Sequence, residues 1–330
     1  MKPLPIPTMD SSSTHVRRCA LTPEDSRAAV VETAWRQGLD SRGAVLLQEG
    51  LNHTWRLLHS GAIAKVWRPG TESETAFRDA RISLWLRRNG IGAPRSVGNS
   101  AFPAPYSGGR YHLQVTYTED LGDRRPSMAV LADVMRRLHH LKVPPGLGLR
   151  KFSPVTRLAR RITELPPGTL DHDQEQHVRG LLADARVAWR SVPWPDPSVI
   201  HGDPGTNNCL LTRNGPALID FEKTEVGPAL WDQAVFAWRC HAFGRPDSEF
   251  KEFVDVYGSD VTEHDDGRTY RILTPIFAIS AWCYAAESAQ IEPALQAEAD
   301  RRLTTVLTRP AFPWGWESAA DAAAKAKAAR

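Results

Sequence analysis

Apolar residues near the start of the chain recur in short runs separated by polar turns, which is the pattern of a small antiparallel sheet. We expect strands over residues 44–47, 55–58 and 62–67, and a further alternating strand over residues 111–118. Lys65 is a cation inside the otherwise apolar third strand. The first third of the chain is therefore predicted to be built on a sheet.

Helical spacing and helix-end signals mark other segments. Thr22 precedes Pro23 and two acidic residues, so a capped helix should begin there and run to about Gly38. Apolar residues at helical spacing after position 73 predict a second helix that stops at Asn89-Gly90. Met128 to Leu141 is amphipathic and predicts a third.

Length and charge narrow the class of protein. A chain of 330 residues exceeds the usual size of one compact core and suggests two structural units. The net charge of +3 is spread along the chain, so a nucleic-acid partner is not indicated. Apolar runs do not reach about 18 residues, and the N-terminus lacks an apolar core of signal-peptide type. We expect no membrane association and a cytoplasmic location.

The ends of the chain and the cysteines carry no predicted chemistry. Residues 1–20 are rich in Pro, Ser and Thr and are expected to form a flexible tail, and residues 319–330 a second tail rich in Ala and Lys. Cys19, Cys209, Cys240 and Cys283 are far apart, without the spacing of a zinc site or a disulfide framework. They are expected to be free thiols.

Two segments carry the candidate chemistry. The apolar pair Val199-Ile200 leads into a turn that contains Asp203, and Asn208 follows five residues later. A second apolar run ends at Asp220, which would place that carboxylate beside Asn208. One carboxylate can orient a nucleophile, while the other, with the amide oxygen, holds magnesium against phosphates. The spacing predicts phosphoryl transfer.

These segments resemble the aminoglycoside phosphotransferase family, the small-molecule branch of the protein-kinase-like fold. Its catalytic loop reads His-Gly-Asp, four variable residues and Asn, as residues 201–208 do; its metal motif matches Ile-Asp-Phe-Glu at 219–222; and its Gly-Pro-x-Leu-Trp-Asp segment matches 227–232. The resemblance implies an α+β bilobal fold. Residues 21–118 would form an N-lobe with an antiparallel sheet and helices, and residues 119–318 a mainly helical C-lobe.

The resemblance also implies roles for matching residues. Asp203 would be the catalytic carboxylate for the acceptor hydroxyl, Asn208 and Asp220 the Mg²⁺ ligands, and His201 a brace for the loop. Asp232 would tie the loop backbone to the following helix. The neighbouring His139 and His140 are expected to be structural.

On the N-lobe, the resemblance implies the residues that bind the nucleotide. Gly50 and Asn52 resemble a Gly-x-x-Asn-type turn over the phosphates, with an ordinary hairpin turn as the alternative, and Lys65 would hold the phosphates. Asp79 falls where the family has a glutamate that pairs with this lysine, and aspartate is one methylene shorter. Either the helix packs closer to Lys65, or the pair is looser, or Glu72 or Glu74 substitutes. Val115 and Tyr117 lie in the strand before the hinge, where backbone groups would contact the base of ATP or GTP.

Several observations bear on the acceptor. Gly202 stands where protein kinases commonly have an arginine that pairs with a phosphorylated loop, and only seven residues separate Asp220 from Pro228, too few for a peptide-docking activation segment. A small-molecule hydroxyl is favoured, bound by residues 145–198 and the helices after 245. The acidic residues Glu263, Asp265 and Asp266 could attract a cation but are read as a solvated loop.

Two classes of function stay open. The first is an enzyme that phosphorylates an antibiotic, such as an aminoglycoside or nucleoside, and so inactivates it, or a metabolic kinase of a sugar, an amino alcohol or a homoserine-like metabolite. The second is a nucleotide-binding module without catalysis, which the departure at Asp79 keeps open. The chain is expected to be a monomer or a dimer.

Overall fold

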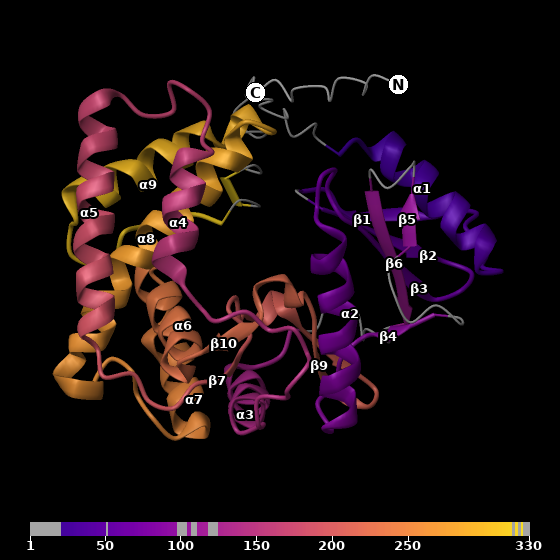
Figure 1. Cartoon of the computed structure of the whole chain (residues 1–330), viewed down its shortest axis with the longest axis horizontal. Helices are drawn as coiled ribbons and strands as arrows, with labels where there is room; N and C mark the ends of the chain where they lie inside the picture. Colours follow the sequence, from indigo (N-terminus) through magenta and orange to yellow (C-terminus); the bar gives the residue numbers. More distant parts are fainter. Residues whose placement is uncertain are drawn as a thin grey trace, which may run out of the picture.

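The computed structural model describes residues 21–50, 52–97, 104–106, 111–117, 125–318, 321, 322 and 325. The expected α+β, protein-kinase-like architecture is confirmed. An antiparallel sheet with two helices forms one side of the molecule, and a mainly helical part forms the other (Figure 1).

The sheet contains the three expected strands and the later one. In the described residues it runs β1-β2-β3-β6-β4, with β5 also paired to β6. Its strands are β1 (Val45–Gln48), β2 (His53–Leu57), β3 (Ala62–Val66), β4 (Arg95–Ser96), β5 (Ala104–Tyr106) and β6 (Tyr111–Tyr117). Every pairing is antiparallel, and Lys65 in β3 pairs with Thr54 and Gln114.

The alternation of side chains in β3 decides which way Lys65 points. Ala62, Ala64 and Val66 are fully buried and belong to a cluster that also contains Ala29 and Val30 of α1 (Pro23–Arg36). Successive side chains of a strand face opposite sides, so Lys65 lies on the face away from α1. Thr22 caps α1 as expected, since its hydroxyl accepts a hydrogen bond from Asp25 N at 3.1 Å.

The second expected helix, α2 (Ser73–Arg88), lies between the sheet and the rest of the chain (Figure 1). It ends before Asn89 and Gly90 as predicted. Its buried face includes Arg78, Asp79 and Ile82. Through this face α2 contacts the short turn Phe221–Lys223.

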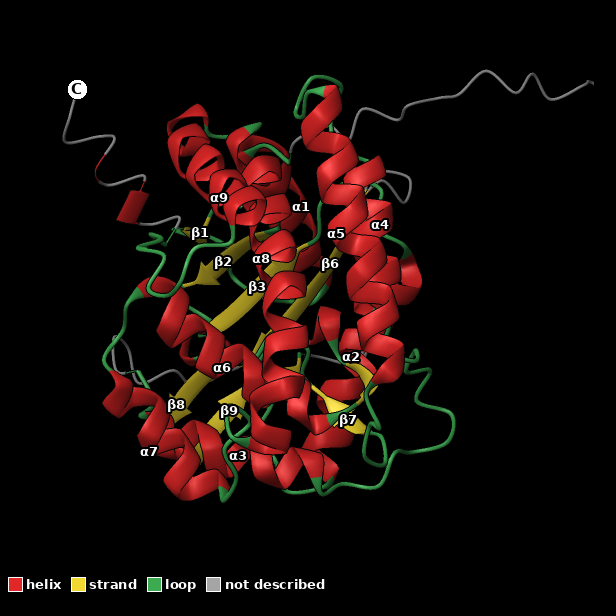
Figure 2. Cartoon of the chain, turned by 90° about the vertical axis from the view of Figure 1, so that its left-hand side faces the viewer, coloured by secondary structure: helices red, strands yellow, loops and turns green. Residues whose placement is uncertain are grey.

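The helical part is built around a large apolar cluster. Its helices are α3 (Met128–His139), α4 (Pro154–Thr163), α5 (His172–Ser191), α6 (Ala229–Phe243), α7 (Asp247–Tyr257), α8 (Arg268–Ala289) and α9 (Gln296–Thr308). Figure 2 shows α4, α5 and α8 in front of the sheet when the molecule is viewed from the helical side. The cluster includes Trp231, Trp238 and Trp282.

Two short strand pairs lie against these helices. β8 (Cys209–Thr212) and β9 (Gly215–Leu218) form a hairpin, and β7 (Ser198–Ile200) pairs with β10 (Glu225–Gly227). The two pairs carry the loops in which the sequence places the candidate chemistry. The fold thereby fixes the distances between those loops.

The structure bears on the expectation of no membrane association. One segment, His264–Ala289, is long and apolar enough to cross a membrane by length and composition, although 56% of the tested window is buried inside the protein. The core helix of a globular domain gives the same signal. Cys209, Cys240 and Cys283 are buried free thiols, and Cys19 lies outside the described residues.

Candidate active site

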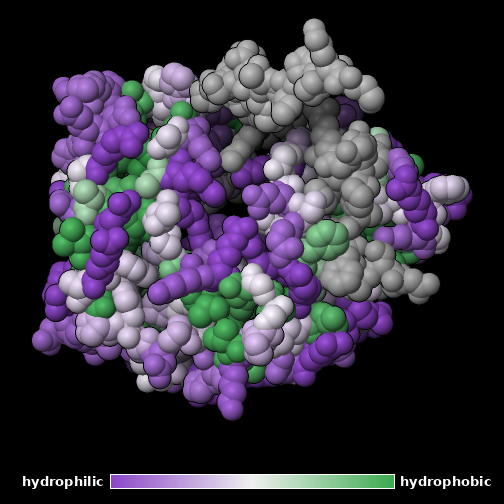
Figure 3. All heavy atoms as spheres, viewed as in Figure 1, coloured by the Kyte–Doolittle hydropathy of each residue, from purple (hydrophilic) through white to green (hydrophobic). Residues whose placement is uncertain are grey.

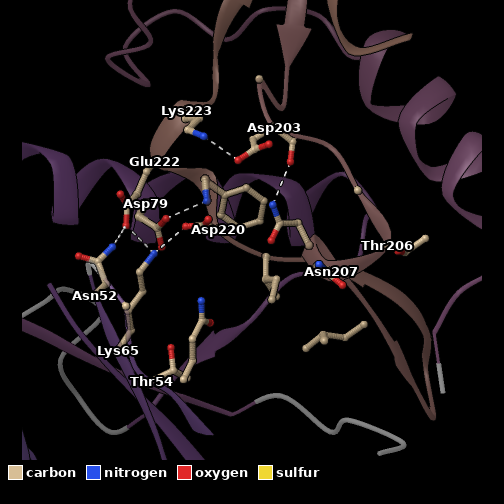
Figure 4. A pocket seen from close by; sticks show the side chains of 18 of the residues that line it. Asn52, Thr54, Lys65, Asp79, Asp203, Thr206, Asn207, Asp220, Glu222 and Lys223 are labelled. Carbon is tan, nitrogen blue, oxygen red and sulfur yellow. Dashed lines mark hydrogen bonds and ion pairs between the residues drawn. The ribbon is translucent and has the colours of Figure 1, made fainter. Parts of the chain in front are cut away.

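The β8–β9 hairpin brings the two candidate metal ligands together. Asn208 directly precedes β8, and Asp220 is the second residue after β9. Ile219 N donates to Asn208 O at 3.0 Å. Asp220 has a left-handed backbone with φ 64° and ψ 69°, which is uncommon for a residue other than glycine. The side-chain amide of Asn208 donates to Asp203 O at 2.9 Å. Three expected site residues thus lie close together, and Figure 4 labels two of them, Asp203 and Asp220.

The catalytic loop is held by Asp232, as expected. The two oxygens of this fully buried carboxylate accept from His201 N at 2.7 Å and Gly202 N at 2.9 Å. His139 Nε2 lies 3.0 Å from the same carboxylate, and its Nδ1 lies 2.7 Å from Tyr257 Oη, which is the structural role expected of this histidine. The loop backbone is therefore anchored to α3 and α6.

His201 and Gly202 have structural contacts of their own. His201 Nε2 lies 3.0 Å from Ile219 O, so the imidazole links the catalytic loop to the residue before Asp220, in keeping with the predicted brace. Gly202 has φ 82°, and a Cβ there would overlap the carbonyl of Lys223. Glycine is required at this position on both grounds.

Asp203 lies between two cations that the sequence did not assign to the site. Lys223 Nζ is 2.7 Å from Oδ2, and Arg239 Nη2 is 2.5 Å from Oδ1 (Figure 4 draws the Lys223 contact). Arg239 also donates to Pro204 O. Burial acts to raise the pKa of Asp203, but the two cations outweigh it and hold the pKa below its usual value. Asp203 is therefore a carboxylate at neutral pH.

Lys65 forms its close ion pairs with Asp220 and Glu222, and Asp79 acts on it only as a further nearby charge, which agrees with the looser pair among the alternatives. Lys65 Nζ lies 2.8 Å from Asp220 Oδ1 and 2.7 Å from Glu222 Oε1. Burial acts to lower the pKa of Lys65, but the nearby carboxylates raise it above its usual value. The same lysine lowers the pKa of Asp220 against the effect of burial. Neither substitute pairs with Lys65: Glu72 pairs with Arg150 and Glu74 with Arg81.

Asp79 instead holds the backbone of the metal-binding segment. Its Oδ1 accepts from Phe221 N at 2.9 Å. Burial, partly offset by Lys65, raises its pKa to about 6. The shorter side chain thus reaches the backbone beside Asp220 and leaves the lysine to Asp220 and Glu222.

Asn52 contacts Glu222, one of the two carboxylates that pair with Lys65. Its Nδ2 donates to Glu222 Oε1 at 2.7 Å, and its Oδ1 accepts from Arg68 N at 3.0 Å. Asn52 therefore links the N-terminal sheet to the segment after β9. Gly50 lines the cleft between the sheet and the helices. Their contact with phosphates stays a prediction.

Val115 and Tyr117 of β6, the two residues expected to lie near the nucleotide base, have different surroundings. Val115 is a core residue: its side chain is buried, it pairs with Ala64 of β3, and its carbonyl accepts from Val97 N at 3.0 Å. That carbonyl already has one hydrogen-bond partner, and the role of Val115 near the base stays a prediction. Tyr117 ends β6 in register with Arg95, and the segment that follows it lies outside the described residues.

Sequence reasoning missed Lys223 and Arg239. Lys223 directly follows the matched Ile-Asp-Phe-Glu segment, and Arg239 lies seven residues after Asp232 on α6. Residues seven apart share a helix face, so a helix anchored to the catalytic loop through Asp232 also presents Arg239 to that loop. This spacing was the available signal.

One large cleft of about 2930 Å³ lies between the sheet and the helices. It is lined by Lys65, Asp203, Asn208, Asp220, Lys223 and Arg239, among others. Hydrophilic side chains gather around the hollow at the centre of Figure 3. From the expected acceptor regions, the cleft is lined by residues of α4 and α8, among them Arg157, Arg161 and Tyr284. The acidic residues Glu263, Asp265 and Asp266 do not line it. Trp282 and Trp316 are buried, as expected for core residues.

The residues present fit a magnesium ion. Asp220 offers a carboxylate and Asn208 an amide oxygen, the oxygen donors that Mg²⁺ takes together with water and substrate phosphates. Lys65 lies against the same carboxylate, where it offsets negative charge. Within the described residues, no group of three or more His, Cys, Asp or Glu suits a metal ion, so an all-protein cage is not formed there.

The fold and site define a small-molecule kinase with a bilobal, protein-kinase-like architecture. The model of the phosphotransferase enzyme family (APH) matches residues 44–271, and the chain belongs to this family. It is a phosphotransferase whose acceptor is a hydroxyl group. No curated protein matches the chain.

Solved structures resemble the chain over most of its length. An amicoumacin kinase in complex with AMP-PNP, Ca²⁺ and Ami has a TM-score of 0.66 at 11% identity, covering 89% of this chain and 96% of its own. A choline/ethanolamine kinase family protein from Mesorhizobium loti has a TM-score of 0.59 at 18% identity, covering 86% and 92%. A spectinomycin phosphotransferase in complex with ADP and spectinomycin has a TM-score of 0.59 at 15% identity, covering 84% and 93%. At these identities the likeness concerns the fold.

Proposed function

We propose that the protein uses Mg²⁺ to transfer the γ-phosphate of ATP or GTP to a hydroxyl of a small molecule, with an antibiotic as the first candidate and its inactivation as the outcome. The observation that supports this most is the meeting of Asp203, Asn208, Asp220 and Lys65 in one cleft. They come from three separate segments, with Asp203 and Asn208 on the same loop, and each has the chemical group that phosphoryl transfer needs.

Asp203 would act on the acceptor. Its carboxylate is ionised and held by two cations, so it can orient a hydroxyl and accept its proton late in the transfer. Lys223 and Arg239 would keep this carboxylate in one orientation and place positive charge near the transferred group. His201 and Asp232 position the loop without touching the substrate.

Asp220, Asn208 and Lys65 would hold the phosphates. Asp220 and Asn208 would bind the magnesium ion, which supplies charge to offset that of the transferred phosphoryl group. In the structure Lys65 pairs with Asp220 and Glu222, and we propose that the α- and β-phosphates replace part of this pairing. Asn52 and Gly50 would cover the phosphates from the sheet.

A metabolic kinase is the second candidate. The likeness to a choline/ethanolamine kinase family protein keeps an amino alcohol among the acceptors, beside a sugar or a homoserine-like metabolite. A catalytically silent nucleotide-binding module would not need the two cations that orient Asp203. Their presence argues for turnover.

The test is transfer of labelled γ-phosphate from ATP, and separately from GTP, to a panel of antibiotics, sugars and choline, with and without Mg²⁺. We expect a phosphorylated product, identified by mass, that needs both metal and acceptor. Binding of Mg-nucleotide without any product across the panel would favour the silent module.

A further inference from the structure

The wall of the cleft beside the catalytic loop is aromatic. Trp231 and Trp238 of α6 and Phe277 of α8 all line the cleft. Ring centroids of Trp231 and Phe277 lie 4.6 Å apart, and those of Trp238 and Phe277 lie 5.4 Å apart. Trp231 Nε1 donates to Gly202 O at 3.3 Å, so this wall is continuous with the loop that carries Asp203. An acceptor whose hydroxyl reaches Asp203 must lie near these rings.

Most carboxylates on this side of the cleft already form ion pairs with lysine or arginine. Asp203 pairs with Lys223 and Arg239, while Glu225 pairs with Arg157 and Glu287 with Arg161 at 3.0 Å. Glu164 and Glu317 are paired as well, whereas Glu292 and Asp321 have no ion pair within the described residues. Lysine and arginine outnumber acidic residues along the whole lining. A polycation would meet few open carboxylates here.

The hydrogen-bonding groups beside Asp203 on this wall are also of one kind, namely donors. The guanidinium of Arg239, whose side chain is 31% exposed, can only donate. Ammonium groups are donors too, so they cannot accept a hydrogen bond from it. Hydroxyl, carbonyl and carboxylate oxygens can.

We propose that the acceptor is an uncharged or acidic hydroxyl compound with a flat or apolar face, and that Arg239 excludes polycations such as unmodified aminoglycosides. This specificity rests on the proposed transfer to a hydroxyl and narrows it. Arg239 determines specificity because it places a positive charge directly against the carboxylate that receives the acceptor hydroxyl.

The test compares two ligands that differ in charge. Kanamycin, whose amino groups are protonated at neutral pH, and its fully N-acetylated derivative are titrated by calorimetry into the protein with Mg²⁺ and AMP-PNP. The same titrations are made with Arg239→Glu and with Arg190→Glu, a matched charge reversal on an exposed residue of α5 outside the cleft. Melting curves establish that both variants are folded.

We expect kanamycin to bind the wild-type protein more weakly than its acetylated form. Its affinity should rise by at least about tenfold in Arg239→Glu and not in Arg190→Glu. Kanamycin that binds the wild-type protein as tightly as the acetylated form, or gains no more affinity in Arg239→Glu than in Arg190→Glu, would overturn the proposal. Binding of AMP-PNP itself, measured in the same samples, tests the proposed function separately: its absence would remove the kinase mechanism and leave the charge comparison readable.

Discussion

Removal of the Asp232 carboxylate should cost both stability and activity. This side chain is fully buried and accepts from His201 N, Gly202 N and His139 Nε2 at 2.7, 2.9 and 3.0 Å. In Asp232→Ala these three groups lose their partner together. An unsatisfied buried donor costs about 1–3 kcal/mol, and the penalties of neighbouring groups overlap. We expect a loss of about 3–5 kcal/mol in the free energy of unfolding.

The assay is equilibrium urea unfolding followed by circular dichroism and tryptophan fluorescence. Asp255→Ala is the control, because Asp255 makes an exposed ion pair with Lys251 on α7 and its loss should change stability by less than about 1 kcal/mol. Because Asp232 orients the catalytic loop, kcat should fall in Asp232→Ala even under conditions where the variant is fully folded. A stability loss equal to that of Asp255→Ala, with unchanged kcat, would refute the reasoning.

Three further changes test other parts of the site. Lys65→Met should lower kcat/KM by about 10²-fold or more, since the phosphates lose their cation. Steady-state kinetics measures this change, and a loss of less than roughly threefold would count against the role of Lys65 in binding the phosphates. Gly202→Ala should lower the free energy of unfolding in urea by about 2 kcal/mol or more, because the left-handed backbone and the Lys223 carbonyl both oppose a Cβ. The control Gly61→Ala, at φ 63° with open space around it, should lower it by only about 1–2 kcal/mol from the backbone alone. Equal losses would show that the close approach to Lys223 has no effect. The pKa of Asp79 is raised from 3.8 to about 6, so the folded state holds this proton more tightly than the unfolded state does. The resulting contribution to stability is present at low pH and is lost as the pH rises from about 4 to 6. Relative to Asp79→Asn, the wild-type protein should lose up to about 3 kcal/mol across that range in urea unfolding; parallel pH profiles of the two proteins would contradict the assignment.

Much of the fold could be predicted because its signals are local. The alternation in residues 62–66 specified both a strand and the face on which Lys65 lies. Thr22 and Pro23 marked the start of α1 for equally local reasons. The loops proposed for catalysis and metal binding could be singled out because their residues lie close together in sequence.

The pairing of charges could not be predicted in the same way. Lys65 has three carboxylates around it, and its choice of Asp220 and Glu222 depends on where the segment after β9 lies in space. Asp79 reaches the Phe221 backbone because of that same placement. The partner of the Val115 carbonyl was equally hidden, because the sequence of a strand does not show which neighbouring segment pairs with it.

Arg239 is an intermediate case. It lies 36 residues from Asp203, so no spacing rule joins the two directly. Its position on the helix face of Asp232 could have suggested the contact, but only once Asp232 was known to hold the loop. Specificity residues of this kind depend on tertiary packing.

The most direct test of the account is acceptor-dependent release of nucleoside diphosphate by Asp203→Asn, measured with Mg²⁺ and the best acceptor of the panel, beside wild-type protein. Asp196→Asn, a change at an exposed residue before β7, is the control. The account predicts that Asp203→Asn loses at least about 10²-fold in kcat while it binds Mg-nucleotide normally, and that Asp196→Asn behaves as wild type. Retention of wild-type kcat by Asp203→Asn would contradict the central claim that this carboxylate receives the acceptor hydroxyl.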